Sequence, residues 1–311
     1  MKTQTSHHKF TAAICAMLGM LALATAHAQI FVSNSDAGTI GKYNADGSVV
    51  NASYITTGAN PYGLALDGTD LYVANLGNSK VGKYNGATGA TINASLISVG
   101  AAPYGLTVGG GYVYVAFYGI NDVARFTTAG TGGIDLVFHG ALSNPRGVAI
   151  DIANNLLYVA NFGSGKIGEY NLTTGASINT DFVTGLSGPL YLALDGGGSL
   201  FVSNYTGGTI GKYNASTGIA VNASFITLAG VAGIGLDGAG DLFAVSYDGG
   251  TVGKYDAGSG AALNASLIIG LTHPLGLAVM PAAIPEPTTC AMGLAALGGF
   301  ALLRRFRRKS A

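Results

Sequence analysis

The sequence predicts an all-β fold, a six-bladed β-propeller whose blades each contain four antiparallel strands. Three observations lead to this prediction. A motif of the type TIGKYN recurs at near-constant spacing, short strand-like runs alternate with turn residues, and no useful helical period occurs between residues 29 and 283. Units of about 40 residues with four short strands are typical of propeller blades.

The repeat is marked by one aromatic residue at the same place in every unit. Successive members are 41 to 44 residues apart, and DVARFT at 122–127 is the most divergent copy of the motif. The six aromatic residues are Tyr43, Tyr84, Phe126, Tyr170, Tyr213 and Tyr255.

The second unit illustrates the expected strands. Its runs are LYVAN, KVGKYN, TINASLI and YGLTV, and the turn sequences DGTD, GNS and GATG lie near or between them. Short runs rich in Val, Ile, Tyr and Leu and bounded by Gly, Asn and Asp indicate strands joined by tight turns. A parallel β-solenoid is the alternative, but its rungs are usually shorter and lack such paired hairpins.

The two ends of the repeat array predict how the ring closes. IFVSN at 30–34 has the character of a second strand, whereas PLGLAV at 274–279 has that of a first strand with no blade after it. Pairing of these segments would complete the first blade from both ends of the chain and hide two free strand edges.

Residues 1–28 have the features of a secretory signal peptide. Lys2 and Lys9 form a charged region before the apolar run at 10–24, and Ala26-His27-Ala28 is a small-x-small cleavage site before Gln29. We therefore expect Ala28 and Gln29 to flank the cut, with the Sec export machinery and signal peptidase as partners. The only cysteines, Cys15 and Cys290, lie outside the body at 29–283, which thus has no disulfide.

The segment 284–311 differs from everything before it. Pro285-Glu286-Pro287 is followed by 16 uncharged residues at 288–303 and then by five basic residues. We expect a hydrophobic helix that spans the inner membrane, although it is slightly short of the usual ~20 residues, with the basic end in the cytoplasm. The chain is thus divided into 1–28, 29–283 and 284–311.

Two resemblances follow from these motifs. The repeats, with LYVAN and PYGLALD at 61–67, resemble the NHL/YVTN class of propellers over roughly residues 30–280. The Pro-Glu-Pro, hydrophobic span and arginine-rich end resemble the PEP-CTERM sorting signal over 284–310. That resemblance implies cleavage near Pro285-Glu286-Pro287 by an exosortase, transient inner-membrane anchoring, and delivery to the surface or extracellular matrix of a Gram-negative bacterium.

Composition argues against several classes of function. The body has eight basic and fourteen acidic residues and no basic stripe, so we do not expect a nucleic-acid partner. We expect no cofactor and no metal, because Glu169 is the only glutamate of the body and four recurring aspartates precede turns. These are Asp67, Asp151, Asp195 and Asp237. No established catalytic motif is present.

Chain direction predicts one face on which candidate site residues gather. The loop before each innermost strand and the turn after the second strand should lie on the same face. The first set of loops carries Tyr62, Tyr104, Arg146, Leu190, Ala232 and Leu275. Tyrosine and arginine are favoured interface residues, so Tyr62, Tyr104, Arg146 and Tyr118 are the binding candidates. Simple packing around the channel mouth is the alternative.

The third unit departs from the others and supplies the weak catalytic candidates. It contains FYGINDVARF at 117–126, and it brings Arg125, His139 and Arg146. Such a departure marks either a site added to a scaffold or neutral drift. The recurring Lys42, Lys83, Lys212 and Lys254 are expected to be solvated charges that oppose aggregation.

Two hypotheses for function remain open. The first is an exported, non-enzymatic surface or matrix protein, processed by exosortase, that binds an extracellular polysaccharide or a surface protein. The second is a secreted lyase or lactone hydrolase that uses Arg146 and His139, with Tyr62 and Tyr104, at the channel mouth.

Overall fold

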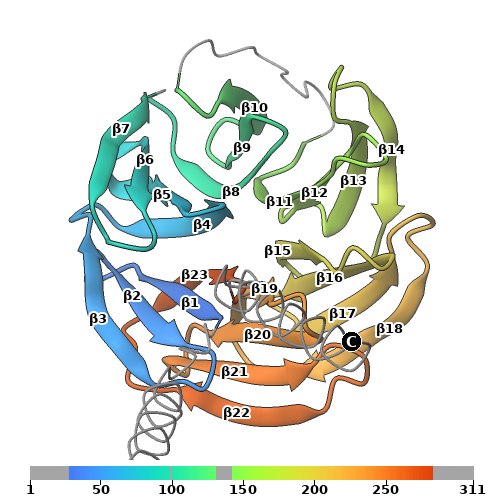
Figure 1. The fold of residues 1–311 in the computed structure, drawn as a ribbon. Helices are drawn as coiled ribbons and strands as arrows, with labels where there is room; N and C mark the ends of the chain where they lie inside the picture. Colours follow the sequence, from blue (N-terminus) through green and yellow to red (C-terminus); the bar gives the residue numbers. More distant parts are fainter. Residues whose placement is uncertain (1–27, 99, 131–141, 283–311) are drawn as a thin grey trace, which may run out of the picture. The chain divides into compact units, whose positions relative to one another are not determined.

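The computed structural model describes residues 28–98, 100–130 and 142–282. They form six antiparallel sheets arranged as blades around a central channel (Figure 1). Five sheets have four strands, and the third has three described strands. The segment 131–141, where its fourth strand is expected, lies outside the described residues. The predicted six-bladed propeller is confirmed.

The strands follow one another from the channel to the rim of each blade. Blade 1 contains β23 (Pro274–Met280), β1 (Gln29–Asn34), β2 (Thr39–Asn44) and β3 (Val49–Thr56). Blade 2 contains β4 (Pro61–Asp67), β5 (Asp70–Asn75), β6 (Lys80–Asn85) and β7 (Thr91–Ser98). Blade 3 contains β8 (Pro103–Gly109), β9 (Tyr112–Phe117) and β10 (Asp122–Thr127). Blade 4 contains β11 (Pro145–Asp151), β12 (Leu156–Asn161), β13 (Lys166–Asn171) and β14 (Ser177–Val183). Blade 5 contains β15 (Pro189–Leu194), β16 (Ser199–Asn204), β17 (Thr209–Asn214) and β18 (Ala220–Thr227). Blade 6 contains β19 (Val231–Leu236), β20 (Asp241–Ser246), β21 (Thr251–Asp256) and β22 (Ala262–Ile268).

Blade 1 closes the ring in the predicted way, because β1 pairs with β23 from the other end of the chain. Ile30 is opposite Val279, and Val32 is opposite Leu277. Ser33 reinforces the closure: its Oγ accepts a hydrogen bond from the Gly276 amide at 2.7 Å and donates one to the Tyr62 carbonyl at 2.7 Å. Ser33 thus ties both ends of the chain to blade 2.

Close approach between neighbouring inner strands explains the glycine that five of the inner strands have as their third residue. A Cβ on Gly63 would lie 2.5 Å from the carbonyl oxygen of Tyr104 in the next blade, and a Cβ on Gly233 would lie 2.5 Å from that of Leu275. No side chain fits at such distances. The second strand of each blade is buried on both faces, as Ile30, Phe31 and Val32 show, because neighbouring blades pack against both sides.

The expectation that the repeated lysines are solvated is wrong for Lys42, and the other three lysines are partly buried. Lys42 is only 4% exposed, lies over the Tyr54 ring at 4.5 Å, and donates a hydrogen bond from Nζ to the Gly86 carbonyl at 2.9 Å. Burial lowers the pKa of Lys42. The long aliphatic stem packs between blades while the ammonium group reaches a polar partner.

The carbonyl that Lys42 reaches belongs to a repeated position, the residue after the third strand. Three further side chains donate to the equivalent carbonyl of the next blade: Arg125 to Leu172, Tyr158 to Ala215 and Lys212 to Ala257. Lys83 and Lys254 instead form ion pairs with Asp70 and Asp241 of their own blades, at 2.7 Å each. The carbonyl after the third strand therefore accepts a hydrogen bond from the preceding blade at four junctions.

The flanking segments are largely outside the described residues. This applies to residues 1–27 and to 283–311, which include Pro285-Glu286-Pro287 and the expected hydrophobic helix. Within the described ranges the only helix is the short 3-10 turn η1 (Leu76–Asn78), so none there is long enough to cross a membrane. Gln29 is the first residue of β1, so the expected cut after Ala28 would leave this strand whole.

Candidate functional site

The loops on one face of the ring are held by a repeated backbone hydrogen bond. In five blades the residue that follows the second strand donates its N–H to the carbonyl of the residue before the first strand. The pairs are Ser35 to His273, Leu76 to Asn60, Phe162 to Asn144, Tyr205 to Gly188 and Tyr247 to Gly230. All five acceptor residues have positive φ, the left-handed conformation that glycine and asparagine tolerate best.

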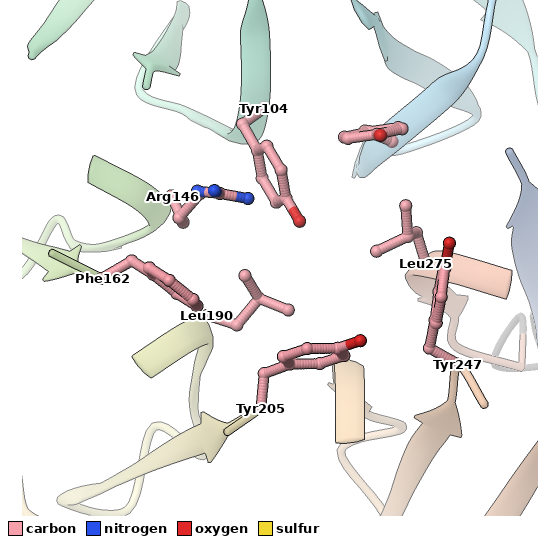
Figure 2. Close-up of a pocket in the computed structure, with 8 residues that line it drawn as sticks. Tyr104, Arg146, Phe162, Leu190, Tyr205, Tyr247 and Leu275 are labelled. Atoms are coloured by element: carbon pink, nitrogen blue, oxygen red, sulfur yellow. The ribbon is translucent and has the colours of Figure 1, made fainter. Parts of the chain in front are cut away.

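These loops surround a cavity of about 240 Å³ at the channel mouth, which we call the mouth cavity. Figure 2 shows its lining side chains pointing toward a common centre. They are Tyr62, Tyr104, Arg146, Phe162, Leu190, Tyr205, Tyr247 and Leu275. Five come from the starts of inner strands, and three follow the second strands, so the two sets of loops do share one face.

Arg146 lies on one side of the mouth cavity within a cage of aromatic rings. Its guanidinium carbon is 4.3 Å from the ring centre of Tyr104, 4.8 Å from that of Tyr118 and 4.7 Å from that of Phe162. Its Nε donates a hydrogen bond to Asn144 Oδ1 at 3.1 Å. Stacked rings hold a planar guanidinium without removing its remaining donors.

The opposite side of the mouth carries His273, Asp36 and Tyr247. The His273 ring stacks on the Tyr247 ring, with centres 4.7 Å apart and planes 20° apart. Its Nδ1 forms a short contact with Asp36 Oδ2. His273 has φ of 45°, which is uncommon for a residue with a side chain and is found more often at functional sites.

Tyr104 and Tyr191 separate the mouth cavity from the channel below. Tyr191 stands where five other inner strands have glycine, and its ring centre is 6.1 Å from that of Tyr104. It lines a second cavity of about 460 Å³ that is bounded mainly by aliphatic side chains of the inner strands. Burial raises the pKa of Tyr104 to about 12, although the charge of Arg146 acts to lower it.

Burial likewise raises the pKa of Tyr191 well above its usual value. The pKa of Tyr62 is also raised, first by burial and then by the nearby Tyr118. These phenols are therefore protonated across the physiological range, so each hydroxyl group can donate a hydrogen bond as well as accept one. None of the three can supply a phenolate base at neutral pH.

The structure brings the four binding candidates together. Tyr62, Tyr104 and Arg146 line the mouth cavity, and Tyr118 packs behind Arg146 with its ring centre 5.9 Å from that of Tyr104. His139 lies outside the described residues. Arg125 is in a different place, because its guanidinium stacks on Tyr112 at 4.5 Å and bonds to Leu172.

Four mouth residues were not among the sequence candidates: Phe162, Tyr205, Tyr247 and His273. Three of them have a signal in the repeat, because Phe162, Tyr205 and Tyr247 occupy the same repeat position as Tyr118, directly after the second strand. His273 replaces the Asn or Gly that precedes most inner strands, and this substitution was also visible in the sequence.

Asp151, Asp195 and Asp237, three of the four recurring aspartates, accept hydrogen bonds within turns. Asp195 Oδ1 accepts hydrogen bonds from the amides of Gly197 and Ser199, and Asp237 Oδ1 accepts them from Ala239 and Asp241. Across the described part of the chain, no group of three His, Cys, Asp or Glu side chains could hold a metal ion.

Comparison with known proteins identifies the C-terminal motif. The model of the PEP-CTERM protein-sorting motif matches residues 283–309. No curated protein matches the sequence.

Solved structures match the propeller at low sequence identity. One is a chain of the nidogen/laminin complex, with a TM-score of 0.69 and 14% identity, covering 83% of this chain and 100% of that chain. Virginiamycin B lyase from Staphylococcus aureus matches with a TM-score of 0.60 and 19% identity, covering 80% and 84%. The computationally designed Ika8 protein matches with a TM-score of 0.52 and 14% identity, covering 79% and 74%. At these identities the likeness shows the fold alone.

Fold and motif together define a class. The chain is a β-propeller protein with a PEP-CTERM sorting motif, and this motif implies export, transient membrane anchoring and processing by exosortase. Neither the motif nor the fold specifies what the propeller does once it is exported.

Proposed function

We propose that the propeller is a binding module of the cell surface or extracellular matrix of a Gram-negative bacterium, and that it binds a carbohydrate at the mouth cavity. The observation that carries this proposal is an aromatic cup formed by Tyr62, Phe162, Tyr205 and Tyr247, with Leu190 and Leu275 as its apolar floor. Figure 2 shows Phe162, Tyr205 and Tyr247 around the two leucines. Concave sites with aromatic walls and a few placed polar groups are the usual form of a ligand site.

A carbohydrate suits this cup better than a flat protein surface. The C–H groups on one face of a sugar ring pack against the electron-rich face of an aromatic ring. The cavity of about 240 Å³ is smaller than the ~300–1,000 Å³ of sites for drug-sized ligands. A single residue of a polymer would therefore enter it, while the rest of the polymer stays outside. A surface protein is the other partner that this face would accept, through its Tyr and Arg side chains.

Glycan binding by purified 29–283 tests the proposal. We expect binding to at least one extracellular polysaccharide, and we expect Tyr205→Ala and Tyr247→Ala to weaken it about tenfold or more. Tyr112→Ala is the control, because Tyr112 lies at the start of its second strand and thus on the opposite face. Binding that is lost equally in all three variants, or absent for every glycan, would contradict the proposal.

A second candidate, an enzyme of the lyase or lactone hydrolase type, has one observation in its favour. The contact of Asp36 with Nδ1 of His273 orients an imidazole whose Nε2 is left for proton transfer. The measurement is turnover of lactones and polysaccharides by wild type, His273→Ala and Arg146→Ala. Turnover that disappears in these variants but persists in Arg125→Ala would favour the enzyme over the binding module.

A further inference from the structure

We propose that the ligand of the mouth cavity is acidic, a uronic acid residue of a polysaccharide whose carboxylate pairs with Arg146. This inference rests on the proposed function and specifies its ligand class. It goes beyond the aromatic cup because it depends on the polar groups on one side of the cavity.

Arg146 has no carboxylate partner among the described residues. The ion pairs found there involve Lys83, Lys166, Lys254 and His273. Its Nε donates a hydrogen bond to the neutral amide oxygen of Asn144, and its side chain also bonds to the Tyr104 hydroxyl, so neither partner is charged. The guanidinium group lies beside Tyr104 among the side chains that line the cavity (Figure 2). A partly buried guanidinium with donors left over matches a carboxylate, which accepts two parallel N–H bonds.

Tyr191 supplies an independent observation. Its side chain is 9% exposed, and its hydroxyl is buried without a hydrogen-bond partner among the described residues. Tyr191 lines the second cavity directly below the mouth cavity, and its ring centre is 6.1 Å from that of Tyr104, which lines the mouth cavity. A buried hydroxyl without a partner is uncommon and calls for a ligand or water that completes it.

Arg146 is the one polar side chain of the mouth cavity that can only donate, because the hydroxyl groups of the lining tyrosines accept as well as donate. Each hydroxyl group of an uncharged sugar brings a donor that Arg146 cannot accept. A carboxylate presents acceptors alone. The match of charge and of donor direction favours the acidic sugar.

Negative charge of the protein lies on the other side of the mouth. Asp36 is in contact with His273, and the pKa values of Tyr205 and Tyr247 are raised first by burial and then by nearby charges that include Asp248. A ligand carboxylate is therefore repelled from that side and attracted to Arg146, which fixes the orientation of the sugar ring against Tyr205 and Tyr247.

An acidic peptide would satisfy Arg146 but not the rest of the cup. Its carboxylate is carried on a flexible chain that has no ring to place between Tyr205, Tyr247 and the floor of Leu190 and Leu275. Ordering that chain also costs conformational entropy that a cyclic sugar has already lost.

The test compares three probes of similar length with purified 29–283 by calorimetry at fixed salt. They are an oligogalacturonate, the same oligomer with its carboxyl groups reduced to alcohols, and an oligo-glutamate peptide. We expect the oligogalacturonate to bind at least tenfold more tightly than the reduced oligomer, and the peptide to bind more weakly than either. Arg146→Gln should abolish the preference for the acidic oligomer, and Arg146→Lys should keep part of it.

Arg125→Gln is the matched control, because it removes the other arginine that packs on an aromatic ring, in a different part of the propeller. It should leave the preference unchanged. Tyr191→Phe should weaken binding of the oligogalacturonate more than binding of the reduced oligomer. Thermal melts of each variant separate a loss of binding from a loss of folding.

Other results separate the two proposals. Equal binding of the acidic and reduced oligomers, both lost in Tyr205→Ala, would overturn the acidic ligand and leave carbohydrate binding intact. Binding of the peptide alone would overturn the sugar. No binding of any glycan would overturn the proposed function itself.

Discussion

Removal of the last strand should open the ring, because β23 is the only inner strand of blade 1. We compare residues 29–283 with residues 29–270, which lack β23 (Pro274–Met280). Leu275 and Leu277 are 5% and 6% exposed, so burial of each contributes about 1.5–3 kcal/mol. Their joint loss of about 3–6 kcal/mol is a large part of a total stability of about 5–15 kcal/mol.

Further interactions disappear with the same strand. The backbone ladder with β1 is removed, and Ser33 Oγ loses its bond from the Gly276 amide. Each such hydrogen bond is worth about 0.5–1.5 kcal/mol. We therefore expect 29–270 to be unfolded or aggregated where 29–283 gives a cooperative melt.

Thermal and urea melts, with the soluble fraction measured for each chain, decide the question. Leu277→Ala in 29–283 is a graded version of the same perturbation, and we expect it to lower the free energy of unfolding by about 2–5 kcal/mol. Equal stability of 29–283 and 29–270 would refute the reasoning, because it would mean that β23 does not contribute to the closed ring.

Three further predictions concern the junctions between strands and blades. Tyr158→Phe removes the 2.7 Å hydrogen bond to the Ala215 carbonyl, so it should destabilise the fold by about 1–2 kcal/mol in urea melts. Tyr72→Phe, at the same position of the repeat, should have a smaller effect, and an equal effect would show that the interblade hydrogen bond is unimportant. Gly211→Ala should lower the melting temperature, because the added Cβ would lie 2.5 Å from the Tyr213 ring. Adding Tyr213→Phe to this variant should restore part of the loss, since blade 3 has Ala124 and Phe126 at the equivalent positions, and no rescue would contradict this explanation. Burial raises the pKa of Glu169, so its ionised form is disfavoured in the folded state and wild-type stability should fall as the pH rises above the pKa of the unfolded chain, about 4.3. Glu169→Gln should be more stable than wild type at pH 7, with a difference that shrinks toward pH 3.5, and a difference independent of pH would refute the raised pKa.

The fold could be predicted in detail because the repeat fixes it. Spacing of the GKYN motif gives the number of blades, and the strand character of 30–34 and 274–279 gives the closure. In PLGLAV, Leu275 and Leu277 are buried and Val279 is partly exposed. Local patterns of this kind report on strand pairing directly.

The environment of the repeated lysines could not be predicted in the same way. Alternation within β2 does not reveal that Tyr54 and the Gly86 carbonyl converge on Lys42, because these groups come from another strand and another blade. A charge at a regular strand position is usually solvated, and only the packing of neighbouring blades overrides this expectation.

The candidate site was partly visible in the sequence. Topology predicted that the residues of the P-x-G turns share a face, but the partners of Arg146 depend on a second set of loops. Phe162, Tyr205 and Tyr247 are spread over 86 residues of sequence, and only the ring brings them together. Tyr191 was not predicted, because a tyrosine at the glycine position of one inner strand resembles neutral sequence drift. Only the fold shows that it packs beside Tyr104.

Closure through β23 sets the order in which an exported chain can finish folding. The chain emerges with β1 first, and the partner of β1 lies about 245 positions later, just before the sorting motif at 283–309. Until residue 280 has arrived, blade 1 has one unpaired inner edge, and blades 2 to 6 can form while the ring stays open. Contacts so distant in sequence form slowly, and open edges favour association with other chains. Export of the last strand, β23, is therefore the step that converts an open row of blades into a closed ring.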